Sequence, residues 1–471
     1  MMQSDDSCVV GNDRIFEKRV IIIGAGISGL ACGCSLKRLG FKNVKILEAR
    51  SRIGGRIHGI NLGSKYIEMG AQWIHGQTDN AIYKIAESKG LVNKEAFNYV
   101  DAMRNFTNFN NDEKIALVKL FDFLEDKVNN FSGNFSPSSL LTFVNEQFQI
   151  FLSQFGPCNV PDFLSEGFEW YCNVLRELNG CQNLSALSVN LLNNYKECEG
   201  NPVVEVKNGL SSLLNVFLEV LNPDWILKNK LVTKIDWSDF KVEFNEQNFE
   251  CESSLKHAKV SKEIRIICQD GEIFRADHVV ITIPLGCLKK YSESLFIPSL
   301  CNNKQKAIHC LGFGAINKVY LEFEEIFWES NDVFNVLWQK VYDDEFLKEA
   351  SGKPYTYCWL KYVGRFAYTP NHPNLLCAWV TGEGAVLMES LSDNEIVGDC
   401  VKLLRLIFGK EIPVPGRIYR SSWMSDPLSC GSYSYLSVDC EKENVTNLDL
   451  AEPEYTDLPC SKVRLHKDNK Y

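Results

Sequence analysis

The first residues whose types and spacing could support chemistry are three glycines near the start of the chain. Gly24, Gly26 and Gly29 form the pattern G-x-G-x-x-G directly after the β-branched run VIII. The first glycine permits a tight turn, the second lets the backbone approach a pyrophosphate, and the third allows a helix to pack closely on a strand. The backbone N–H groups of Ile27 and Ser28 would then lie at the positive end of this helix, where they can bind phosphates.

An acidic residue follows the glycines at the distance expected for dinucleotide binding. The segment NVKILEA reads as a second strand, and Glu48 at its end lies 19 residues after Gly29. A carboxylate in this position accepts hydrogen bonds from ribose hydroxyls and disfavours a 2′-phosphate. A glycine pattern alone can be purely structural. Strand, helix, second strand and acid in register predict a dinucleotide cofactor.

The elements that position these residues can be predicted from the same sequence. The 17 uncharged residues from Val20 to Leu36 approach the length of a membrane span, but their glycines indicate instead a strand, a turn and a helix that stops at Gly40. Segments 231–237 and 264–284 have strand composition. Residues 112–128 have helical periodicity. The apolar stripe of that helix is most simply core and consists of Ile115, Val118, Phe121, Leu124 and Val128.

Composition limits the class of protein. The 471 residues include 50 basic and 60 acidic side chains, which give a net charge of −10, and 45% of the residues are hydrophobic. These values exclude a disordered or fibrous chain. The acidic balance argues against nucleic acid as a partner, because phosphate binding needs a basic face. The acidic charge favours cationic small molecules as partners.

Cysteine and histidine spacing argues against a metal site. The chain has 18 cysteines and seven histidines, without a C-x-x-C or H-x-x-x-H pair. The N-terminal residues lack the basic and apolar regions of a secretory signal, so the cysteines are expected to be reduced thiols. The chain ends in Asn-Lys-Tyr and not in a peroxisomal Ser-Lys-Leu-type signal. We therefore expect a cytoplasmic location and no membrane span.

Further motifs connect the chain to a known family. The run RSRIGGR, residues 50–56, follows Glu48 closely, and YIEMGAQWIHG comes next. Together these elements resemble the flavin-containing amine oxidases, in particular the polyamine oxidase branch with spermine oxidase and N1-acetylpolyamine oxidase. Taken alone, two arginines near a glycine pair would more often form a solvated turn. The resemblance implies FAD as cofactor, with further contacts from Arg50, Arg56, Gly70, Ala71, Gln72, Trp73, Val232 and Trp423.

The resemblance extends over two later stretches, residues 311–328 and 420–435. Taken alone, Lys318 reads as an ordinary lysine that precedes, with Asn317, a strand with one apolar face. The resemblance implies instead that Lys318 is catalytic and hydrogen-bonds a water opposite the flavin N5, with a pKa lowered by desolvation. Tyr433 is implied as one wall of an aromatic slot for the substrate amine.

His75, in the motif WIHG, is the second implied catalytic residue. By resemblance it lies beside the substrate and contributes to substrate binding. The alternative is a histidine whose ring nitrogens are satisfied by backbone groups.

The fold implied by the resemblance is α/β, with a Rossmann-like FAD-binding domain interleaved with an α+β substrate domain. The expected FAD-binding segments are 1–95, 216–294 and 416–471, and the expected substrate-binding segments are 96–215 and 295–415. The implied reaction is oxidation of spermine or an N1-acetylated polyamine at a secondary amine by O₂, which releases hydrogen peroxide, an aldehyde and a shorter amine. The oligomeric state stays open.

The C-terminal stretch departs from the family pattern. After LAEP at 450–453 the family continues into a strand, a turn and a glycine-containing helix that contact FAD, whereas SKVRLHKDNKY is charged and has no such signal. Two hypotheses therefore stay open. One is an active FAD-dependent polyamine oxidase. The other is a truncated, non-catalytic homologue with weak FAD binding or a protein-interaction role. An NAD-dependent dehydrogenase is a distant third, because GGR and GAQWIHG have no function there.

Overall fold

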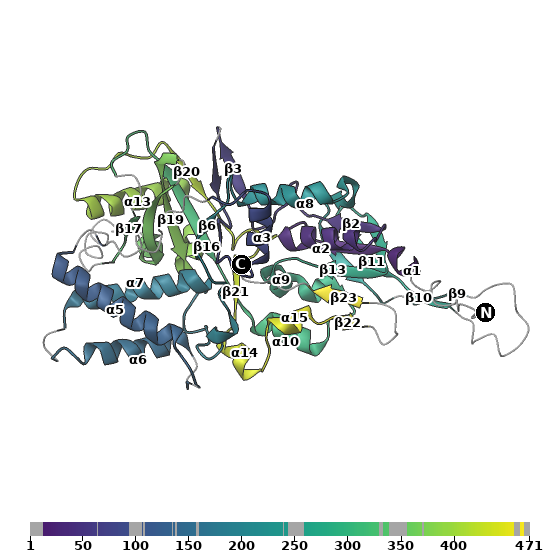
Figure 1. Ribbon diagram of the computed structural model, residues 1–471, viewed down its shortest axis with the longest axis horizontal. Helices are drawn as coiled ribbons and strands as arrows, with labels where there is room; N and C mark the ends of the chain where they lie inside the picture. The colour runs from purple at the N-terminus through teal and green to yellow at the C-terminus, as the bar shows by residue number, and fades with distance from the viewer. Residues whose placement is uncertain are drawn as a thin grey trace, which may run out of the picture. The chain divides into compact units, whose positions relative to one another are not determined.

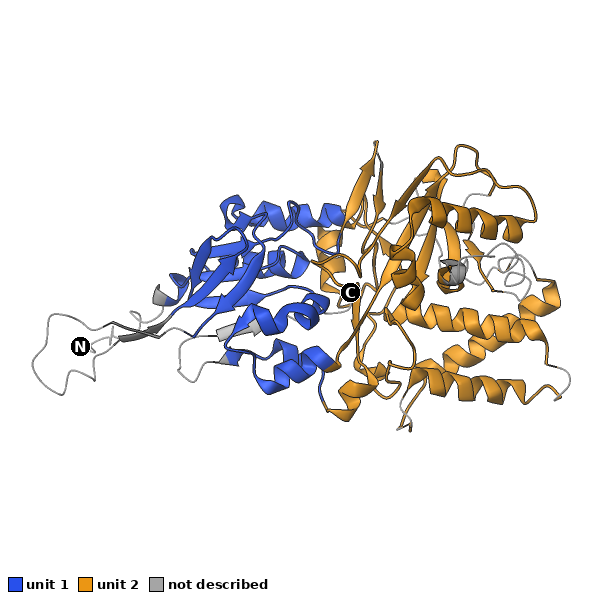
Figure 2. Ribbon diagram, turned by 180° about the vertical axis from the view of Figure 1, so that it is seen from behind, with its two compact units in different colours: residues 1–57, 211–309, 445–469 blue, residues 58–210, 310–444, 470–471 orange. Residues whose placement is uncertain are grey.

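Two compact units, each assembled from separated segments, make up the chain in the computed structural model (Figures 1 and 2). Unit 1 comprises residues 1–57, 211–309 and 445–469, and unit 2 comprises 58–210, 310–444, 470 and 471. The structure describes residues 13–63, 65–93, 106, 109–133, 135, 136, 139–156, 160–238, 240–243, 259–328, 333–338, 356–369, 372–455 and 462–465.

Unit 1 is built on a six-stranded sheet in the order β22-β23-β13-β1-β2-β7. The central strand β1 pairs in parallel with β2 and with β13. All four side chains of β1 are buried, which explains its continuous run of β-branched residues. The predicted Rossmann-like fold is confirmed. The strands of this sheet are β1 (Val20–Ile23), β2 (Val44–Leu47), β7 (Ile226–Leu227), β13 (His278–Ile281), β22 (Glu454–Tyr455) and β23 (Lys462–Leu465).

The first helix after β1 is α2 (Ile27–Arg38), whose Gly33 allows close packing on the sheet. A Cβ at Gly33 would lie 2.9 Å from side-chain carbons of both Ile46 and Leu221. The helix ends at the predicted position, because Gly40 has a φ of +92° that glycine adopts without strain. The other described helices of this part of the chain are α1 (Asp13–Phe16), α8 (Leu214–Val220), η3 (Pro223–Trp225), α9 (Leu285–Leu295), α10 (Asn302–Cys310) and α15 (Asn447–Ala451).

A second sheet of unit 1 has the order β12-β11-β8-β14. The predicted strands at 231–237 and 264–284 are confirmed as β8 and as β11, β12 and β13, with a turn at Gly271. Strands β9 and β10 form a separate pair. The bounds are β8 (Val232–Asp236), β9 (Phe240–Glu243), β10 (Lys259–Lys262), β11 (Ile264–Cys268), β12 (Ile273–Ala276) and β14 (Phe296–Ile297).

The strand β23 corrects one expectation from the sequence. Residues 461–471 were expected to carry no strand signal, yet Lys462–Leu465 pairs in parallel with β13. Backbone hydrogen bonds hold this pairing, so it does not depend on an apolar pattern. The residues after 465 lie outside the described part of the chain.

Unit 2 contains a five-stranded antiparallel sheet in the order β17-β18-β19-β16-β20. Strand β16 lies between β19 and β20 and begins at Ile316. Asn317 and Lys318 therefore lie inside the strand, whereas the sequence suggested that they precede it. Both faces of β16 are buried, which corrects the expectation of a single apolar face. The strands are β16 (Ile316–Glu322), β17 (Val333–Asn335), β18 (Val363–Thr369), β19 (His372–Thr381) and β20 (Arg417–Arg420).

Two clusters of side chains cover the two faces of β16. Val319 and Leu321 pack into a core with residues of α12 (Gly382–Glu389) and α13 (Asp393–Phe408). Tyr320, between them in the strand, packs into a smaller cluster with Trp379. The alternation in the sequence is therefore real, but it separates two cores and not a core from solvent.

The helices α5 (Asn111–Asn129), α6 (Leu140–Leu152) and α7 (Asp162–Asn179) pack on one another in unit 2 (Figure 1). The helix predicted at 112–128 is confirmed, and a capping box between Asn110 and Glu113 starts it. Its buried stripe differs from the predicted one because Ile115 is exposed. The buried positions are Leu117, Leu120, Phe121 and Leu124.

The remaining elements of unit 2 carry the segments around the candidate site. Residues 58–93 and 416–444, for which the resemblance implies a place in the FAD-binding domain, belong to this unit. The division of functions between the domains stays a prediction. The elements are β3 (Gly59–Leu62), β4 (Lys65–Glu68), β5 (Trp73–Ile74), α3 (Ala81–Ser88), η1 (Leu192–Asn194), β6 (Val204–Glu205), β15 (Gly312–Gly314), η5 (Thr356–Tyr362), β21 (Tyr433–Tyr435) and α14 (Val438–Lys442), and η2 (Leu210–Leu213) joins unit 2 to unit 1.

Candidate functional site

The glycine loop of unit 1 leaves a space that suits phosphates. Gly24 has a φ of +104°, which an L side chain rarely adopts. A Cβ at Gly29 would lie only 2.0 Å from the Gly24 carbonyl oxygen, so the third glycine is needed for packing. A Cβ at Gly26, in contrast, would meet no protein atom within 4 Å. This glycine keeps open a surface at the N-terminus of α2, where Gly26 provides no side-chain cap.

Glu48 lies beside this loop. It is 6% exposed, and its Oε2 accepts a hydrogen bond of 2.8 Å from the Ala25 N–H. Its Oε1 accepts another of 2.8 Å from the Arg50 N–H. An ionised carboxylate has about four lone-pair sites, so Glu48 keeps acceptor capacity for ribose hydroxyls.

The turn that carries the arginine motif is tied to the glycine loop. The Gly54 N–H donates to the Ala25 oxygen at 2.9 Å, and Gly54 also forms a β-bridge with Gly26. Gly54 and Gly55 both have positive φ values, +98° and +57°. Arg56 therefore follows a turn that lies against the loop, and the residues of this part of unit 1 fit a dinucleotide.

A second constellation surrounds Lys318 in unit 2. The Lys318 ammonium donates to the Glu68 oxygen at 3.0 Å, to the Gly70 oxygen at 2.9 Å and to Gln72 Oε1 at 2.7 Å. The side chain is buried, and burial lowers the pKa of Lys318 to about 8. The three N–H groups of the charged form thus have three acceptors from one segment of the chain.

Two tryptophans flank this lysine. The rings of Trp73 and Trp379 stack with centroids 5.9 Å apart and an interplanar angle of 20°. Lys318 Nζ lies 6.0 Å from the centroid of Trp73 and 5.9 Å from that of Trp379. At these distances both rings attract the charged form of the lysine. Burial lowers the pKa of Lys318, the charges of Cys377, Glu68 and Glu177 act in the opposite direction, and burial has the larger effect.

A buried asparagine fixes the neighbouring strand end. Asn317 Oδ1 accepts from the Ser421 hydroxyl and from the Trp423 N–H, both at 3.1 Å. The Asn317 amide donates to Glu389 Oε1 at 2.7 Å. The Trp423 indole N–H in turn donates to the Met69 oxygen at 3.2 Å. Trp423 is thereby held to the same segment, residues 68–72, that accepts the hydrogen bonds of the lysine.

The structure orients His75 and Tyr433 in different ways. His75 is exposed, and its Nδ1–H donates to the Pro202 oxygen at 2.7 Å, since a carbonyl can only accept. In the neutral ring Nε2 then carries a lone pair. Tyr433 lies in β21 opposite Gly314 of β15, and its ring closely approaches Gly180, where a Cβ would be 2.3 Å from Tyr433 Cβ.

The comparisons with known proteins identify the family. The model of the flavin containing amine oxidoreductases matches residues 27–451. The chain belongs to this family. It is similar to the peroxisomal N(1)-acetyl-spermine/spermidine oxidase of Bos taurus, with 27% identity over 91% of this chain and 86% of the relative, and to that of Homo sapiens, with 28% identity over 89% and 84%. A solved structure of putrescine oxidase bound to putrescine, 16% identical, covers 95% of this chain and 93% of its own, with a TM-score of 0.62, and shows the same fold.

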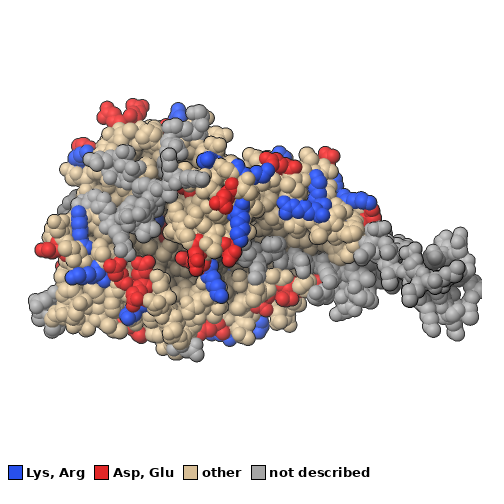
Figure 3. Space-filling view, in the orientation of Figure 1, with Lys and Arg blue, Asp and Glu red and all other residues tan. Residues whose placement is uncertain are grey.

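The cofactor of this amine oxidoreductase is FAD. The glycine loop, Glu48 and the GGR turn of unit 1 are the residues that would hold it. No helix within the described residues is long and apolar enough to cross a membrane. On the face shown in Figure 3, basic and acidic side chains of the described residues are mixed, and neither kind covers the face alone.

The structure separates the predicted site residues into two groups. Gly24, Gly26, Ile27, Ser28, Gly29, Glu48, Arg50, Arg56 and Val232 lie in unit 1, whereas Gly70, Ala71, Gln72, Trp73, His75, Lys318, Trp423 and Tyr433 lie in unit 2. Within unit 2, contacts with Lys318 or with residues 68–72 bring together Gly70, Gln72, Trp73, Lys318 and Trp423. Ala71 lies in the same segment. The roles of all these residues stay predictions.

Sequence reasoning missed Trp379 and the partners of Asn317. Trp379 lies directly opposite Lys318 in the β16–β19 pair. The strand LLCAWVT around it carries no motif, so only the pairing register could have indicated it. Gln72 was predicted as a FAD contact, and its hydrogen bond to Lys318 was not expected.

The lowered pKa of Lys318 predicts how stability depends on pH. Between about pH 8 and pH 10.5 the unfolded chain binds the lysine proton while the folded chain has released it, so the free energy of unfolding should rise with pH in this window. Lys318→Met lacks this contribution. Denaturant unfolding of both proteins at pH 7.5, 8.5 and 9.5 should show the wild type gaining stability relative to the variant. Parallel pH curves for the two proteins would contradict the assignment.

Proposed function

We propose that this chain oxidises polyamines, spermine or N1-acetylated polyamines, at a secondary amine. The overall reaction takes up O₂ and water and releases hydrogen peroxide, an aldehyde and a shorter amine. The observation that carries the proposal is Lys318, a buried lysine with a pKa near 8 between the two tryptophans Trp73 and Trp379. The similarity to N(1)-acetyl-spermine/spermidine oxidases over most of both chains supports the substrate class.

FAD, when bound, accepts the hydride from the carbon next to the amine nitrogen and passes the electrons to O₂. The protein must supply a neutral amine and manage protons. His75 Nε2 is a suitable acceptor for a proton from the substrate ammonium, because Nδ1 is already committed to Pro202. Lys318 can hold or release a proton at Nζ near neutral pH.

The aromatic residues have a separate role. Trp73 and the proposed wall Tyr433 offer ring faces that would bind the charged amine by cation–π attraction, while their apolar surface favours the neutral form that reacts. The buried Trp379 stacks on Trp73 and supports its ring. In its present geometry the Lys318 ammonium has three protein acceptors. A water held by this lysine therefore requires the neutral amine, or the loss of one of these hydrogen bonds.

The substrate class can be tested directly. Purified protein supplied with FAD should release peroxide from spermine or N1-acetylspermine in preference to benzylamine or serotonin. The reason is that an elongated cationic substrate suits a protein of net charge −10 whose proposed substrate site carries aromatic side chains. A peroxide-coupled assay at equal substrate concentrations checks this. Preference for benzylamine or serotonin would overturn the polyamine assignment.

A cytoplasmic location is likewise proposed from the sequence. The two mammalian relatives are described as peroxisomal. Fractionation of cells that express the untagged chain would decide between the two compartments.

A further inference from the structure

Glu205 occupies a position next to the aromatic pair of the candidate site. In the β5–β6 pair, Glu205 lies directly opposite Trp73. Side chains opposite each other in an antiparallel pair project from the same face and interact. The carboxylate therefore shares its side of this ribbon with the Trp73 indole, which stacks on Trp379 and lies 6.0 Å from the Lys318 ammonium.

The Glu205 carboxylate has little compensation for its charge. The residue is half-buried, and burial raises its pKa, although a hydrogen bond from Asn93 acts in the opposite direction. That bond, from the Asn93 amide to Oε2, is long at 3.4 Å. Within the described residues no ion pair ends on Glu205, and the ammonium of Lys207 on the same chain segment donates instead to the Gly90 oxygen at 3.2 Å. A carboxylate in this setting is stabilised by a cation.

Aromatic side chains from neighbouring strands lie on the Glu205 segment or interact with its charge. The Tyr66 hydroxyl donates to the oxygen of Val206, the next residue after Glu205, at 3.3 Å. Burial raises the pKa of Tyr66 to about 12, and the charges of Glu68 and Glu205 add to this effect. Burial also raises the pKa of Tyr368, and Glu205 again contributes. Tyr66 comes from β4 and Tyr368 from β18. With Trp73 of β5, which lies opposite Glu205, three strands thus carry an aromatic side chain that interacts with this acid or pairs across from it.

We propose that Glu205 and the rings of Trp73, Tyr66 and Tyr368 bind an alkylammonium group of the substrate, remote from the nitrogen that is oxidised. A half-buried carboxylate pairs with an ammonium through charge-assisted hydrogen bonds, and the ring faces attract the same cation. A polyamine carries several such groups, whereas a monoamine carries one. This inference rests on the proposed function, because it identifies what selects a polyamine at that site.

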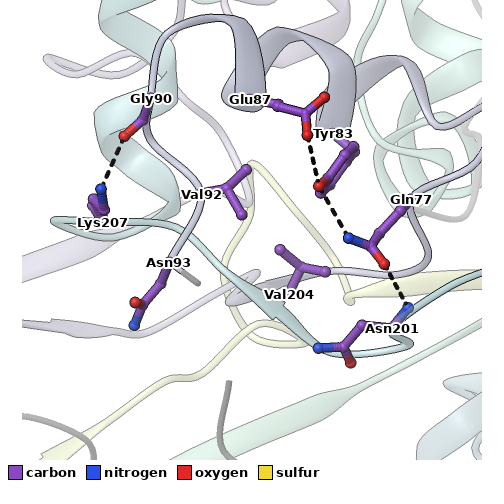
Figure 4. Close-up of a pocket in the computed structure, with 9 residues that line it drawn as sticks. All are labelled: Gln77, Tyr83, Glu87, Gly90, Val92, Asn93, Asn201, Val204 and Lys207. Atoms are coloured by element: carbon purple, nitrogen blue, oxygen red, sulfur yellow. Dashed lines mark hydrogen bonds between the residues drawn. The ribbon is translucent and has the colours of Figure 1, made fainter. Parts of the chain in front are cut away.

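A cavity of about 560 Å³ lies beside the chain segment that carries Glu205, although Glu205 itself does not line it (Figure 4). Val204, which precedes Glu205, and Asn93, which donates to it, both line the cavity. The opposite wall carries a second carboxylate, Glu87, which accepts from the Tyr83 hydroxyl at 3.0 Å. Figure 4 shows Gln77, Tyr83 and Glu87 joined by hydrogen bonds along that wall. Because the Glu87 carboxylate already accepts a hydrogen bond from Tyr83, Glu87 is the alternative acid against which the assignment to Glu205 is checked.

The test compares Glu205→Gln with Glu197→Gln, which removes the same charge from an exposed position eight residues earlier. In the FAD-loaded enzyme, the KM for spermine should rise about 10- to 100-fold in Glu205→Gln, the effect of a lost hydrogen bond to a charged group, with kcat within about twofold. Benzylamine, if it is turned over, should lose nothing. Calorimetric titration of spermine should show the same loss of affinity, and Glu205→Asp should recover part of it.

Several outcomes would overturn the inference. These are an unchanged spermine affinity in Glu205→Gln, a fall in kcat with KM unchanged, an equal loss in Glu197→Gln, or a loss that appears only in Glu87→Gln. If Glu205→Gln fails to fold, Glu205→Asp is measured in its place. The aspartate keeps the carboxylate but holds it one methylene further from the substrate ammonium. A wild-type KM for spermine in that variant would also overturn the inference. If the wild type neither binds nor oxidises polyamines, the proposed function itself fails, which is a distinguishable result.

Discussion

Lys318→Met should slow reduction of the bound flavin by a polyamine by about 10²–10⁴-fold, the range for a lost acid–base group. FAD should stay bound, because the glycine loop and Glu48 are untouched. Anaerobic stopped-flow measurement of flavin absorbance gives the rate. Lys84→Met is the matched control, since Lys84 is an exposed lysine of the same unit whose ammonium pairs with Asp79 on the surface. A wild-type reduction rate in Lys318→Met would end the catalytic assignment.

A structural role for Lys318 must be separated from a proton-transfer role. Replacing the lysine removes the donor for the carbonyls of Glu68 and Gly70 and for the Gln72 side chain. A variant could therefore lose activity because the segment 68–72 shifts. The pH profile distinguishes the two roles. If Lys318 transfers a proton, the rate of flavin reduction changes with pH around pH 8 in the wild type, and this change is absent in Lys318→Met. A change that persists in the variant assigns Lys318 to positioning alone.

The contrast between the two groups of site residues shows what sequence reasoning can reach. The features around Gly24, Gly26, Gly29 and Glu48 were predictable because a strand, a turn and a helix close together in sequence produce them. Backbone conformation and local periodicity specify such a unit. The structure confirms the strand, the turn and the end of the helix at Gly40.

The surroundings of Lys318 could not be predicted in the same way. Its acceptors come from residues 68–72, about 250 positions earlier, and its aromatic neighbour Trp379 comes from the adjacent strand. Contacts of this kind depend on tertiary pairing, for which a single sequence carries no periodic signal. The resemblance to the family pointed to Lys318. It did not indicate which three groups accept the hydrogen bonds of the buried ammonium. Glu205 had no motif at all, and only its register opposite Trp73 indicates a role.

The expectation of one apolar face on β16 was wrong for a related reason. Alternation of Val319, Tyr320 and Leu321 normally separates core from solvent. Here a helical layer packs on one face and a second aromatic cluster on the other, so even Tyr320 is only 2% exposed. The same two-sided burial makes Lys318 a buried lysine. An ordinary exposed strand end would have left its pKa unshifted.

The second large effect is expected from the glycine loop. Gly26→Ala places a methyl group in the space that a Cβ would occupy without touching any protein atom. The backbone of Gly26, with φ −69° and ψ 174°, is open to alanine, so the unfolding temperature of the FAD-free protein should not fall. The affinity for FAD should nevertheless fall roughly 100-fold, the loss of about two hydrogen bonds to a charged group, because the methyl keeps the pyrophosphate away from the N-terminus of α2.

Two further alanine variants make this expectation specific to the cofactor. Gly29→Ala should destabilise the FAD-free protein, since its Cβ would collide with the Gly24 oxygen. Gly398→Ala in α13 adds a methyl in open space away from the loop, so it should leave the FAD affinity unchanged and should not lower the melting temperature, because alanine is favoured over glycine inside a helix. Equilibrium dialysis of FAD and thermal melts of the FAD-free proteins measure the two effects independently. If Gly26→Ala bound FAD as tightly as Gly398→Ala, the open surface before α2 would not be the phosphate site. A lowered melting temperature in Gly26→Ala would equally show that the second glycine serves the fold and not the cofactor.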